Sequence, residues 1–240
     1  MITIYPDLES LSRAAAALVA AEVQGAVVAR GHFSMALSGG GTPRRAYELL
    51  AGPPWHEQAP WDRVHVFWGD ERCVPQDDPR SNAGQARQAW LDRVPIPPGQ
   101  IHPMTCGPDP AGAARQYEAR LRGFYKGPPP WLDLVLLGLG QDGHTASLFP
   151  GTPALVEQER WVAEVYRPEP GPHRVTLTAW FINQARVVVF LVAGADKAGV
   201  LREVISGARG PGDLPARLIQ PESGDLRWLV DREAAALLTL

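Results

Sequence analysis

The sequence has no excess of positive charge and no long hydrophobic run, and each absence excludes a class of protein. Its 23 basic residues are outnumbered by 26 acidic ones, which gives a net charge of -3. Such a chain lacks the positive charge that would neutralise a nucleic-acid backbone. The longest apolar run, residues 187–195, is far shorter than the ~20 residues that span a bilayer. We therefore expect no nucleic-acid partner and no membrane span.

Cysteine and lysine are also scarce. The two cysteines, Cys73 and Cys106, lie far apart and in no C-x-x-C arrangement, which argues against a disulfide framework and a zinc knuckle and favours a reducing, cytoplasmic location. The first residues lack the basic-then-apolar order of a signal peptide, so we expect a soluble chain that is not exported. Only two of the 23 basic residues are lysines, Lys126 and Lys197, and each is worth examining for a specific role.

The remaining composition is that of a globular protein. Apolar residues make up 45% of the chain, and glycine and proline contribute 24 residues each, less than in disordered or collagen-like chains. At 240 residues the chain suits one α/β domain with long crossovers, so we expect a single domain over residues 1–240. We expect a monomer or a small homo-oligomer.

Short apolar runs alternate with helical stretches. The apolar runs predict buried strands at residues 33–37, 64–68, 132–137, 187–192 and 227–230. The helical stretches are residues 8–30, 42–50, 81–91, 111–125, 195–205 and 232–238. This order predicts an α/β fold, a mostly parallel sheet with helices on both faces, whose ligand site lies at the carboxyl ends of the strands.

The first candidate site is a glycine-rich segment between a predicted strand and a predicted helix. It comprises Ser38, Gly39, Gly40, Gly41 and Thr42, and Pro43 follows at the first helical position. Glycines let the backbone approach an anion closely, and a helix N-terminus offers free N–H groups, so the segment suits a phosphate. The alternative is a plain tight turn capped by Thr42. The segment is not a P-loop, because the G-x-x-x-x-G-K-[ST] pattern of P-loops is absent.

The second candidate site follows the predicted strand at 64–68. Asp70, Glu71 and Arg72 are three consecutive charged residues at the end of a buried strand, where this class of fold places its ligands. A solvated loop would have the same composition. Ser81 and Asn82 open the next predicted helix, and capping alone explains that pair.

The third segment carries a carboxylate and an imidazole. Gly138, Gly140 and Gly143 satisfy G-x-G-x-x-G after a strand, a pattern typical of a dinucleotide site. Pro150, however, interrupts the long helix which that reading requires. What remains is a glycine-rich loop in which Asp142 is placed to orient His144, whose imidazole suits proton transfer near neutral pH.

Two cations near other predicted strand ends form the fourth candidate. Arg174 precedes a predicted helix, and Lys197 follows the strand at 187–192. Two such cations suit a phosphate clamp with charge-assisted hydrogen bonds. Surface ion pairs are the alternative.

Taken together, these segments resemble the 6-phosphogluconolactonase family over nearly the whole chain. The most specific part is the Asp-Gly-His-Thr-Ala-Ser-Leu-Phe-Pro run at residues 142–150. The resemblance implies a modified Rossmann-type fold, shared with glucosamine-6-phosphate deaminase. It also implies opening of 6-phospho-D-glucono-1,5-lactone to 6-phosphogluconate in the pentose phosphate pathway, with a sugar-phosphate lactone as small-molecule partner and with no metal and no nucleotide cofactor.

This reading assigns a role to each candidate residue. We expect His144 to take a proton from the attacking water, Asp142 to hold its ring, and Arg72 or loop N–H groups to stabilise the oxyanion. The remaining candidates are expected to bind the substrate, with the glycine segment, Arg174 and Lys197 at its phosphate. They are Ser38, Gly39, Gly40, Gly41, Thr42, Asp70, Asn82, Gly140, Arg174 and Lys197.

Three other functions compete with this one. A sugar-phosphate isomerase or deaminase on the same scaffold would use Asp70 as a carboxylate base. In the deaminase pattern a tyrosine and an acidic residue stand where this chain has Arg72 and Phe149, which disfavours that reading. A non-catalytic sugar-phosphate sensor would bind its ligand without turnover, and a nicotinamide enzyme would bind NAD(H) or NADP(H).

Overall fold

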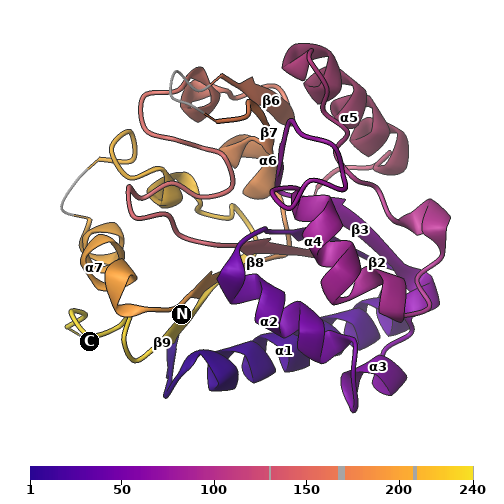
Figure 1. The fold of residues 1–240 in the computed structure, drawn as a ribbon, viewed down its shortest axis with the longest axis horizontal. Helices are drawn as coiled ribbons and strands as arrows, with labels where there is room; N and C mark the ends of the chain where they lie inside the picture. Colours follow the sequence, from indigo (N-terminus) through magenta and orange to yellow (C-terminus); the bar gives the residue numbers. More distant parts are fainter. Residues whose placement is uncertain (130, 167–170, 208–209, 240) are drawn as a thin grey trace.

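The centre of the computed structural model is a six-stranded sheet in the order β1-β9-β8-β5-β2-β3, in which every neighbouring pair of strands is parallel (Figure 1). Its strands are β1 (Ile2–Tyr5), β2 (Phe33–Leu37), β3 (Val64–Trp68), β5 (Leu134–Leu137), β8 (Val187–Val192) and β9 (Asp225–Asp231). The structure describes residues 1–129, 131–166, 171–207 and 210–239. Helices flank the sheet, and the predicted α/β class is confirmed.

The central strands are buried along their whole length. Every residue of β2, β5 and β8 is buried, which explains why these segments are almost entirely apolar, with Ser34 as the one polar residue, rather than alternating. The predicted strands at 33–37, 64–68 and 187–192 have the observed bounds. β1 was not predicted; it pairs with β9 at the edge of the sheet.

The α-helices of the described residues include all those predicted except the one at the C-terminus, each within three residues of its predicted bounds, and two four-residue helices for which no range was predicted. They are α1 (Leu8–Arg30), α2 (Gly41–Leu50), α3 (Trp55–Gln58), α4 (Asn82–Ala89), α5 (Pro110–Phe124), α6 (Ala179–Ile182) and α7 (Ala198–Ser206). Asp7 caps α1 by accepting a hydrogen bond from the Ser10 N–H, and Gly31 ends it in the left-handed conformation with φ 80°, as expected. The predicted helix at 232–238 is wrong, since these residues form turns.

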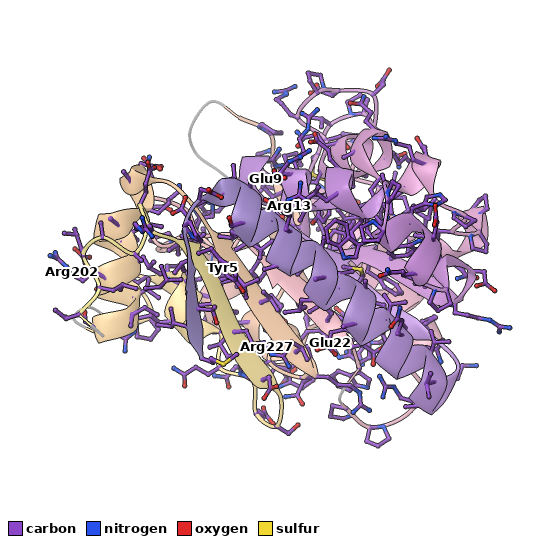
Figure 2. All side chains as sticks on the ribbon, turned by 90° about the horizontal axis from the view of Figure 1, so that it is seen from below. Tyr5, Glu9, Arg13, Glu22, Arg202 and Arg227 are labelled. Carbon is purple, nitrogen blue, oxygen red and sulfur yellow. A yellow bond between two sulfur atoms is a disulfide. The ribbon has the colours of Figure 1, made fainter. Side chains whose placement is uncertain are left out.

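α1 is long and apolar enough to cross a membrane by length and composition, a test that the core helix of a soluble protein also passes. Its apolar stripe packs here against β2 and β9 of the sheet, and Figure 2 shows it lying along the strands at this face. In this fold the sheet therefore covers the helix's apolar side.

A second, smaller sheet was not predicted. It has the antiparallel order β4-β7-β6, with β4 (Asp70–Arg72), β7 (Arg174–Leu177) and β6 (Val162–Val165). Gly69 joins the two sheets: its N–H donates to the Leu37 carbonyl of β2 at 2.8 Å, and its carbonyl accepts from the Leu177 N–H at 2.7 Å. The chain therefore passes directly from β3 of the large sheet into β4 of the small one.

The expectation that the chain has no disulfide is wrong. Cys73 and Cys106 are bonded to each other, with their Cα atoms 4.5 Å apart. The two residues are separated by 33 positions in the sequence, and the fold brings them together beside the end of β4. Spacing along the chain carries no information about such a pair, because the pairing depends on tertiary structure.

Candidate active site

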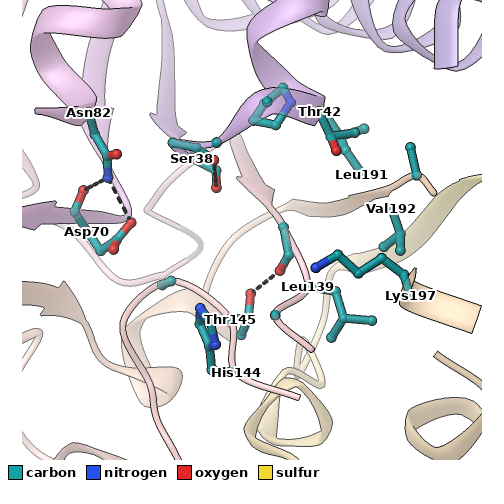
Figure 3. Close-up of a pocket in the computed structure, with 18 of the residues that line it drawn as sticks. Ser38, Thr42, Asp70, Asn82, Leu139, His144, Thr145, Leu191, Val192 and Lys197 are labelled. Carbon is teal, nitrogen blue, oxygen red and sulfur yellow. Dashed lines mark hydrogen bonds between the residues drawn. The ribbon is translucent and has the colours of Figure 1, made fainter. Parts of the chain in front are cut away.

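One cavity of about 340 Å³ lies at the carboxyl ends of the parallel strands (Figure 3). It brings together all the predicted site residues except Asp142, namely Ser38, Gly39, Gly40, Gly41, Thr42, Asp70, Arg72, Asn82, Gly140, His144, Arg174 and Lys197. The segments that follow β8, β5, β2 and β3 all contribute to it, and these strands are consecutive neighbours in the sheet. Its charged lining side chains are Asp70 and three cations, a balance that suits an anionic ligand.

The glycine segment leaves the start of α2 open toward the cavity. Gly40, with φ 102°, is the N-cap residue of α2, and no described side chain caps the helix. Thr42 is therefore not the cap, and Pro43 is the third helical residue rather than the first. The Tyr47 hydroxyl holds Ser38 by accepting from its N–H and donating to its carbonyl. The free N–H groups at this helix start are suited to an anion.

Gly39 allows the glycine segment to approach α4 closely. A Cβ atom at this position would collide with the side-chain amide of Asn82. That amide donates from Nδ2 to the Asp70 carbonyl at 2.9 Å and to Asp70 Oδ1 at 3.2 Å, and Figure 3 shows both bonds. The Asn82 side chain thus joins the loop after β2 to the strand that carries Asp70.

A buried carboxylate that sequence reasoning gave no role holds this part of the site. Glu71 accepts from the N–H groups of Arg72, Asn82 and Ala83 and from the Ser81 hydroxyl. Burial raises the pKa of Glu71, while its backbone hydrogen bonds act in the opposite direction. Glu71 therefore fixes the backbone of its neighbour Arg72 and the start of α4, where a carboxylate is favourable.

Asp70 is fully engaged with its neighbours. One oxygen, Oδ2, accepts a 2.5 Å hydrogen bond from the Ser147 hydroxyl and lies 3.9 Å from Arg174 Nη1. The other, Oδ1, accepts from Asn82. Ser147 was not predicted, although it lies in the same specific run as His144, because its partner is remote in the sequence.

His144 and Asp142 have the predicted geometry. His144 Nδ1 lies 2.5 Å from Asp142 Oδ1, which also accepts from the His144 N–H at 3.2 Å. The hydrogen bond from His144 lowers the pKa of Asp142 to about 2, so this carboxylate is ionised at neutral pH. An ionised partner on Nδ1 favours the tautomer that leaves the Nε2 lone pair free to accept a proton.

The turn that carries His144 is built by backbone contacts. Gly140 donates its N–H to the His144 carbonyl at 2.8 Å and accepts from the Gly143 N–H at 3.0 Å. A Cβ atom on Gly140 would collide with the His144 ring, and Gly143 has φ 79°. Both positions therefore require glycine, the first for close approach and the second for its backbone conformation.

Phe149 packs beside two side chains that line the cavity, His144 and Arg174. Its ring centroid is 4.4 Å from that of His144 and 5.8 Å from Cζ of Arg174. An aromatic ring thus stands at the position where the deaminase pattern has an acidic residue. Arg174 reaches the cavity from β7, between Asp70 and Phe149.

Lys197 reaches the cavity from the segment after β8 and is tied to the histidine turn. It belongs to η5, the 3₁₀ turn Ala195–Lys197, and its Nζ lies 3.3 Å from Asp196 Oδ2. Gln141 Nε2 donates to the same oxygen at 2.8 Å. Asp196 and Gln141, which the sequence did not single out, therefore connect the lysine to the turn that carries His144.

Arg72 is held at its guanidinium end by the loop that follows it. Its Nη1 donates to the Arg80 carbonyl, and its buried Nε has no hydrogen-bond partner among the described residues. A buried donor without a partner costs free energy unless a ligand satisfies it. Arg72 lines the cavity, but this Nε is enclosed by protein, so the guanidinium offers a ligand its other N–H groups.

A second hollow, of about 460 Å³, lies at the opposite, amino ends of the strands. None of the predicted site residues lines it. Two arginines at this end, Arg30 and Arg186, are both within ion-pair distance of the buried Asp133. Within the described ranges, no group of three or more His, Cys, Asp or Glu side chains is placed to hold a metal ion.

Comparison with known proteins agrees with the resemblance. The family described as glucosamine-6-phosphate isomerases/6-phosphogluconolactonase matches residues 6–228. The chain belongs to this family. A 6-phosphogluconolactonase of Synechocystis sp. is 47% identical over 237 residues, which cover 97% of this chain and 96% of that protein. One from Mycobacterium tuberculosis is 41% identical over 245 residues, with coverages of 99% and 98%.

Solved structures give the same family. The 6-phosphogluconolactonase from Trypanosoma brucei is similar with a TM-score of 0.88 at 28% identity and covers 100% of this chain and 98% of its own. A monomeric glucosamine-6-phosphate deaminase has a TM-score of 0.83 at 23% identity, with coverages of 99% and 99%, and shows a shared fold. Since both kinds of protein have this fold, the choice of reaction rests on the site.

Proposed function

We propose that this chain is a 6-phosphogluconolactonase, which hydrolyses 6-phospho-D-glucono-1,5-lactone to 6-phospho-D-gluconate in the pentose phosphate pathway. The observation that carries the proposal is the His144–Asp142 pair in one cavity with the open start of α2 and Lys197. The curated relatives that cover the whole chain are named for this activity, which supports the assignment.

His144 acts as the general base. Its Nε2 takes a proton from a water molecule while the water oxygen attacks the lactone carbonyl carbon. The ionised Asp142 on Nδ1 stabilises the imidazolium that forms and fixes the orientation of the ring. A positioned base of this kind contributes about 10²- to 10⁴-fold to the rate.

The negative charge that develops on the carbonyl oxygen needs hydrogen-bond donors. Arg72 is a cation that lines the cavity from β4, so it is the donor we assign. One such donor is worth roughly 3 kcal/mol. When the tetrahedral intermediate collapses, the ring oxygen leaves and takes from His144 the proton that came from the water. This returns the base to its starting state.

The phosphate is bound away from the reacting carbon. The N–H groups of Gly41 and Thr42 at the uncapped start of α2, together with Lys197, supply donors and positive charge. Arg174 adds a further cation from the β7 side. Asp70, Asn82 and Gly140 face the sugar, where carboxylate and amide oxygens accept hydrogen bonds from its hydroxyl groups. Binding energy from the remote phosphate serves to place the lactone carbon against His144.

The isomerase or deaminase reaction fits this site less well. It requires a carboxylate base beside the sugar carbon, and Asp70 is the candidate. Each oxygen of Asp70 already accepts one hydrogen bond, Oδ2 from Ser147 and Oδ1 from Asn82. The carboxylate can still accept from a sugar hydroxyl, but its neighbours hold it in place. Phe149, which packs on the His144 ring, stands where that pattern has an acidic residue.

The test is acid release from freshly prepared 6-phosphogluconolactone, corrected for its spontaneous opening. We expect turnover well above the uncatalysed rate and no ammonia release from glucosamine 6-phosphate. Ammonia release without lactone opening would assign the deaminase reaction instead. Tight binding of the lactone without turnover would assign a sensor, and binding of NAD(H) or NADP(H) would favour a nicotinamide enzyme.

The proposal includes the setting in which the enzyme works. It places the chain in the cytoplasm as a monomer or small homo-oligomer, with a small sugar-phosphate lactone as its partner. It assigns no metal or cofactor, no nucleic acid and no membrane. Size-exclusion chromatography with light scattering measures the oligomeric state, and activity retained after treatment with a chelator tests the assignment of no metal.

A further inference from the structure

The only two cysteines of the chain are bonded to each other next to the proposed active site. Cys73 directly follows Arg72, the last residue of β4, and its N–H donates to the His173 carbonyl at 2.8 Å. Its side chain is half-buried, whereas Cys106 is 7% exposed. The bond therefore begins one residue away from a side chain that lines the cavity.

Cys106 lies in a segment attached to the large sheet. The His102 N–H donates to the Val66 carbonyl of β3 at 2.8 Å, and the His102 carbonyl accepts from the Tyr117 hydroxyl of α5 at 3.0 Å. The disulfide thus connects the loop after β4, in the small sheet, to a segment that β3 and α5 hold in place. It fixes the first residue of that loop.

The far end of the same loop holds Arg72. The loop runs over residues 73–80, and its last residue, Arg80, accepts the hydrogen bond from Arg72 Nη1. Asp78 in turn holds the Arg80 side chain through its carboxylate. Because Arg72 Nε has no other partner within the described ranges, the position of its guanidinium depends on this loop.

We propose that Cys73 and Cys106 form a thiol–disulfide exchange site for a dithiol reductant, and that the disulfide holds Arg72 in its position in the cavity. The neighbouring Glu71 keeps its hydrogen bonds to Ser81, Asn82 and Ala83 in either state. The change on reduction is therefore confined to Arg72 and the loop, while the start of α2 and Lys197 remain as they are.

The exchange proceeds in two balanced steps. A thiolate of the reductant attacks Cys73 Sγ, the more exposed sulfur. The electron pair of the S–S bond passes to Cys106 Sγ, which leaves as a thiolate and takes a proton. The second thiol of the reductant then attacks its own sulfur in the mixed disulfide and releases Cys73. The reductant becomes a disulfide, and two electrons and two protons are transferred to the cysteines.

The consequence for activity rests on the proposed function. If Arg72 stabilises the oxyanion, a less firmly held guanidinium lowers kcat/KM by roughly 3- to 10-fold. Inhibition by inorganic phosphate, which is expected at the start of α2 and Lys197, does not change. A general loss of structure would instead alter both quantities.

The experiment compares the oxidised full-length protein with the same protein after dithiothreitol, with alkylation and mass spectrometry to count free thiols. We expect two thiols only after reduction, faster hydrogen exchange in residues 73–80, the lower kcat/KM and an unchanged inhibition constant for phosphate. The double variant Cys73→Ser/Cys106→Ser is the matched control, and dithiothreitol should not alter it.

Two results would overturn the inference. One is two free thiols in protein kept under oxidising conditions, which means that the bond does not form. The other is equal hydrogen exchange and equal kcat/KM in both redox states. If neither state opens the lactone, the proposed function fails, and hydrogen exchange over residues 73–80 still decides whether the disulfide fixes the loop.

Discussion

The large parallel sheet and the small antiparallel sheet meet at the cavity and supply different parts of it. The large sheet supplies loops: the open start of α2, the His144 turn and Lys197 follow three of its buried strands. The small sheet supplies side chains directly from its strands, with Asp70 and Arg72 on β4 and Arg174 on β7. Under the proposed function, the large sheet thus positions the base and most of the phosphate site, while the small sheet supplies the groups assigned to the sugar and the oxyanion, together with Arg174 at the phosphate.

The two sheets are also anchored differently. The central strands of the large sheet are held by a continuous buried core. The small sheet has three short strands, whose apolar residues, such as Val162 and Leu177, belong to the same core and pack against α5. It is tied to the rest of the molecule through Gly69 and, beside β4, through the Cys73–Cys106 bond. Substitutions that weaken the attachment of the small sheet should therefore affect the site residues on β4 and β7 more than those that follow the strands of the large sheet.

The largest effect is expected at the base. His144→Ala should lower kcat by about 10²- to 10⁴-fold because no group remains at that point to take the proton from water. Phosphate inhibition and melting temperature should stay near wild type. Steady-state rates with fresh lactone measure this, with His32→Ala, an exposed histidine outside the cavity, as the control. Activity within about threefold of wild type would show that the base is another group.

The next largest effect concerns the stability of the small-sheet side. The disulfide closes a loop between residues separated by 33 positions, and chain entropy predicts that it contributes about 4 kcal/mol to the free energy of unfolding. Cys73→Ser/Cys106→Ser should therefore lower the melting temperature by roughly 10 °C. Calorimetry of the oxidised wild type and of the variant checks this. Identical melting temperatures would mean that the small sheet does not depend on this anchor.

Lys197→Met should weaken phosphate binding while leaving the reaction step in place. Removal of one charge-assisted hydrogen bond to phosphate should raise KM by about 10- to 100-fold with little change in kcat. The variant keeps the length of the side chain. Lys126→Met, which changes the other lysine outside this cavity, is the matched control. A fall in kcat with unchanged KM would contradict the assignment of Lys197 to the phosphate end.

Asp142→Asn tests how the His144 ring is held. Its amide does not favour the required tautomer, so kcat should fall by roughly 10-fold or more. The pKa of Asp142 is about 2, so its carboxylate becomes protonated only as the pH falls toward that value. The loss in kcat should therefore be present throughout the range from about pH 6 to pH 8. Rate profiles for both proteins check this, and an effect that appears only above pH 7 would contradict it.

The smallest effect is expected at the hydrogen bond that connects the His144 turn to the segment that carries Lys197. Gln141→Ala removes the hydrogen bond to Asp196 and frees Asp196 to draw Lys197 away from the substrate. Since the bond is exposed, KM should rise only about 2- to 3-fold. A comparison with Gln158→Ala, a glutamine outside the cavity lining, calibrates the assay. A change in kcat alone would show that Gln141 acts on the histidine turn instead.

The large sheet could be predicted because its signals are local. β2 and β3 are mostly apolar runs, each with one polar residue, and α1 has an aspartate cap and a terminating glycine. Each segment follows from its own composition. The glycine segment and the His144 turn were found for the same reason, since their positions after buried strands are visible in the sequence.

The small sheet and the disulfide could not be predicted because they depend on distant partners. β4 is the three charged residues Asp70–Arg72, and it is a strand only because β7 pairs with it about one hundred positions later. Ser147 and Glu71 likewise have their roles through contacts that the sequence does not reveal. The predicted C-terminal helix fails because, after the cap-like bond from the Ala234 N–H to Asp231, the N–H groups of Ala236 and Leu238 bond to carbonyls only three residues back, which forms turns.

The most direct test of the assignment of the base to His144 and of phosphate binding to Lys197 uses two substrates. It measures kcat/KM on the phosphorylated lactone and on unphosphorylated glucono-1,5-lactone for wild type, His144→Ala and Lys197→Met. We predict that His144→Ala lowers both values by the same factor, so that the preference for the phosphorylated lactone is retained. Lys197→Met should reduce that preference by about 10- to 100-fold and leave the unphosphorylated substrate unaffected. Equal losses on both substrates in Lys197→Met, or an unchanged rate in His144→Ala, would contradict the account.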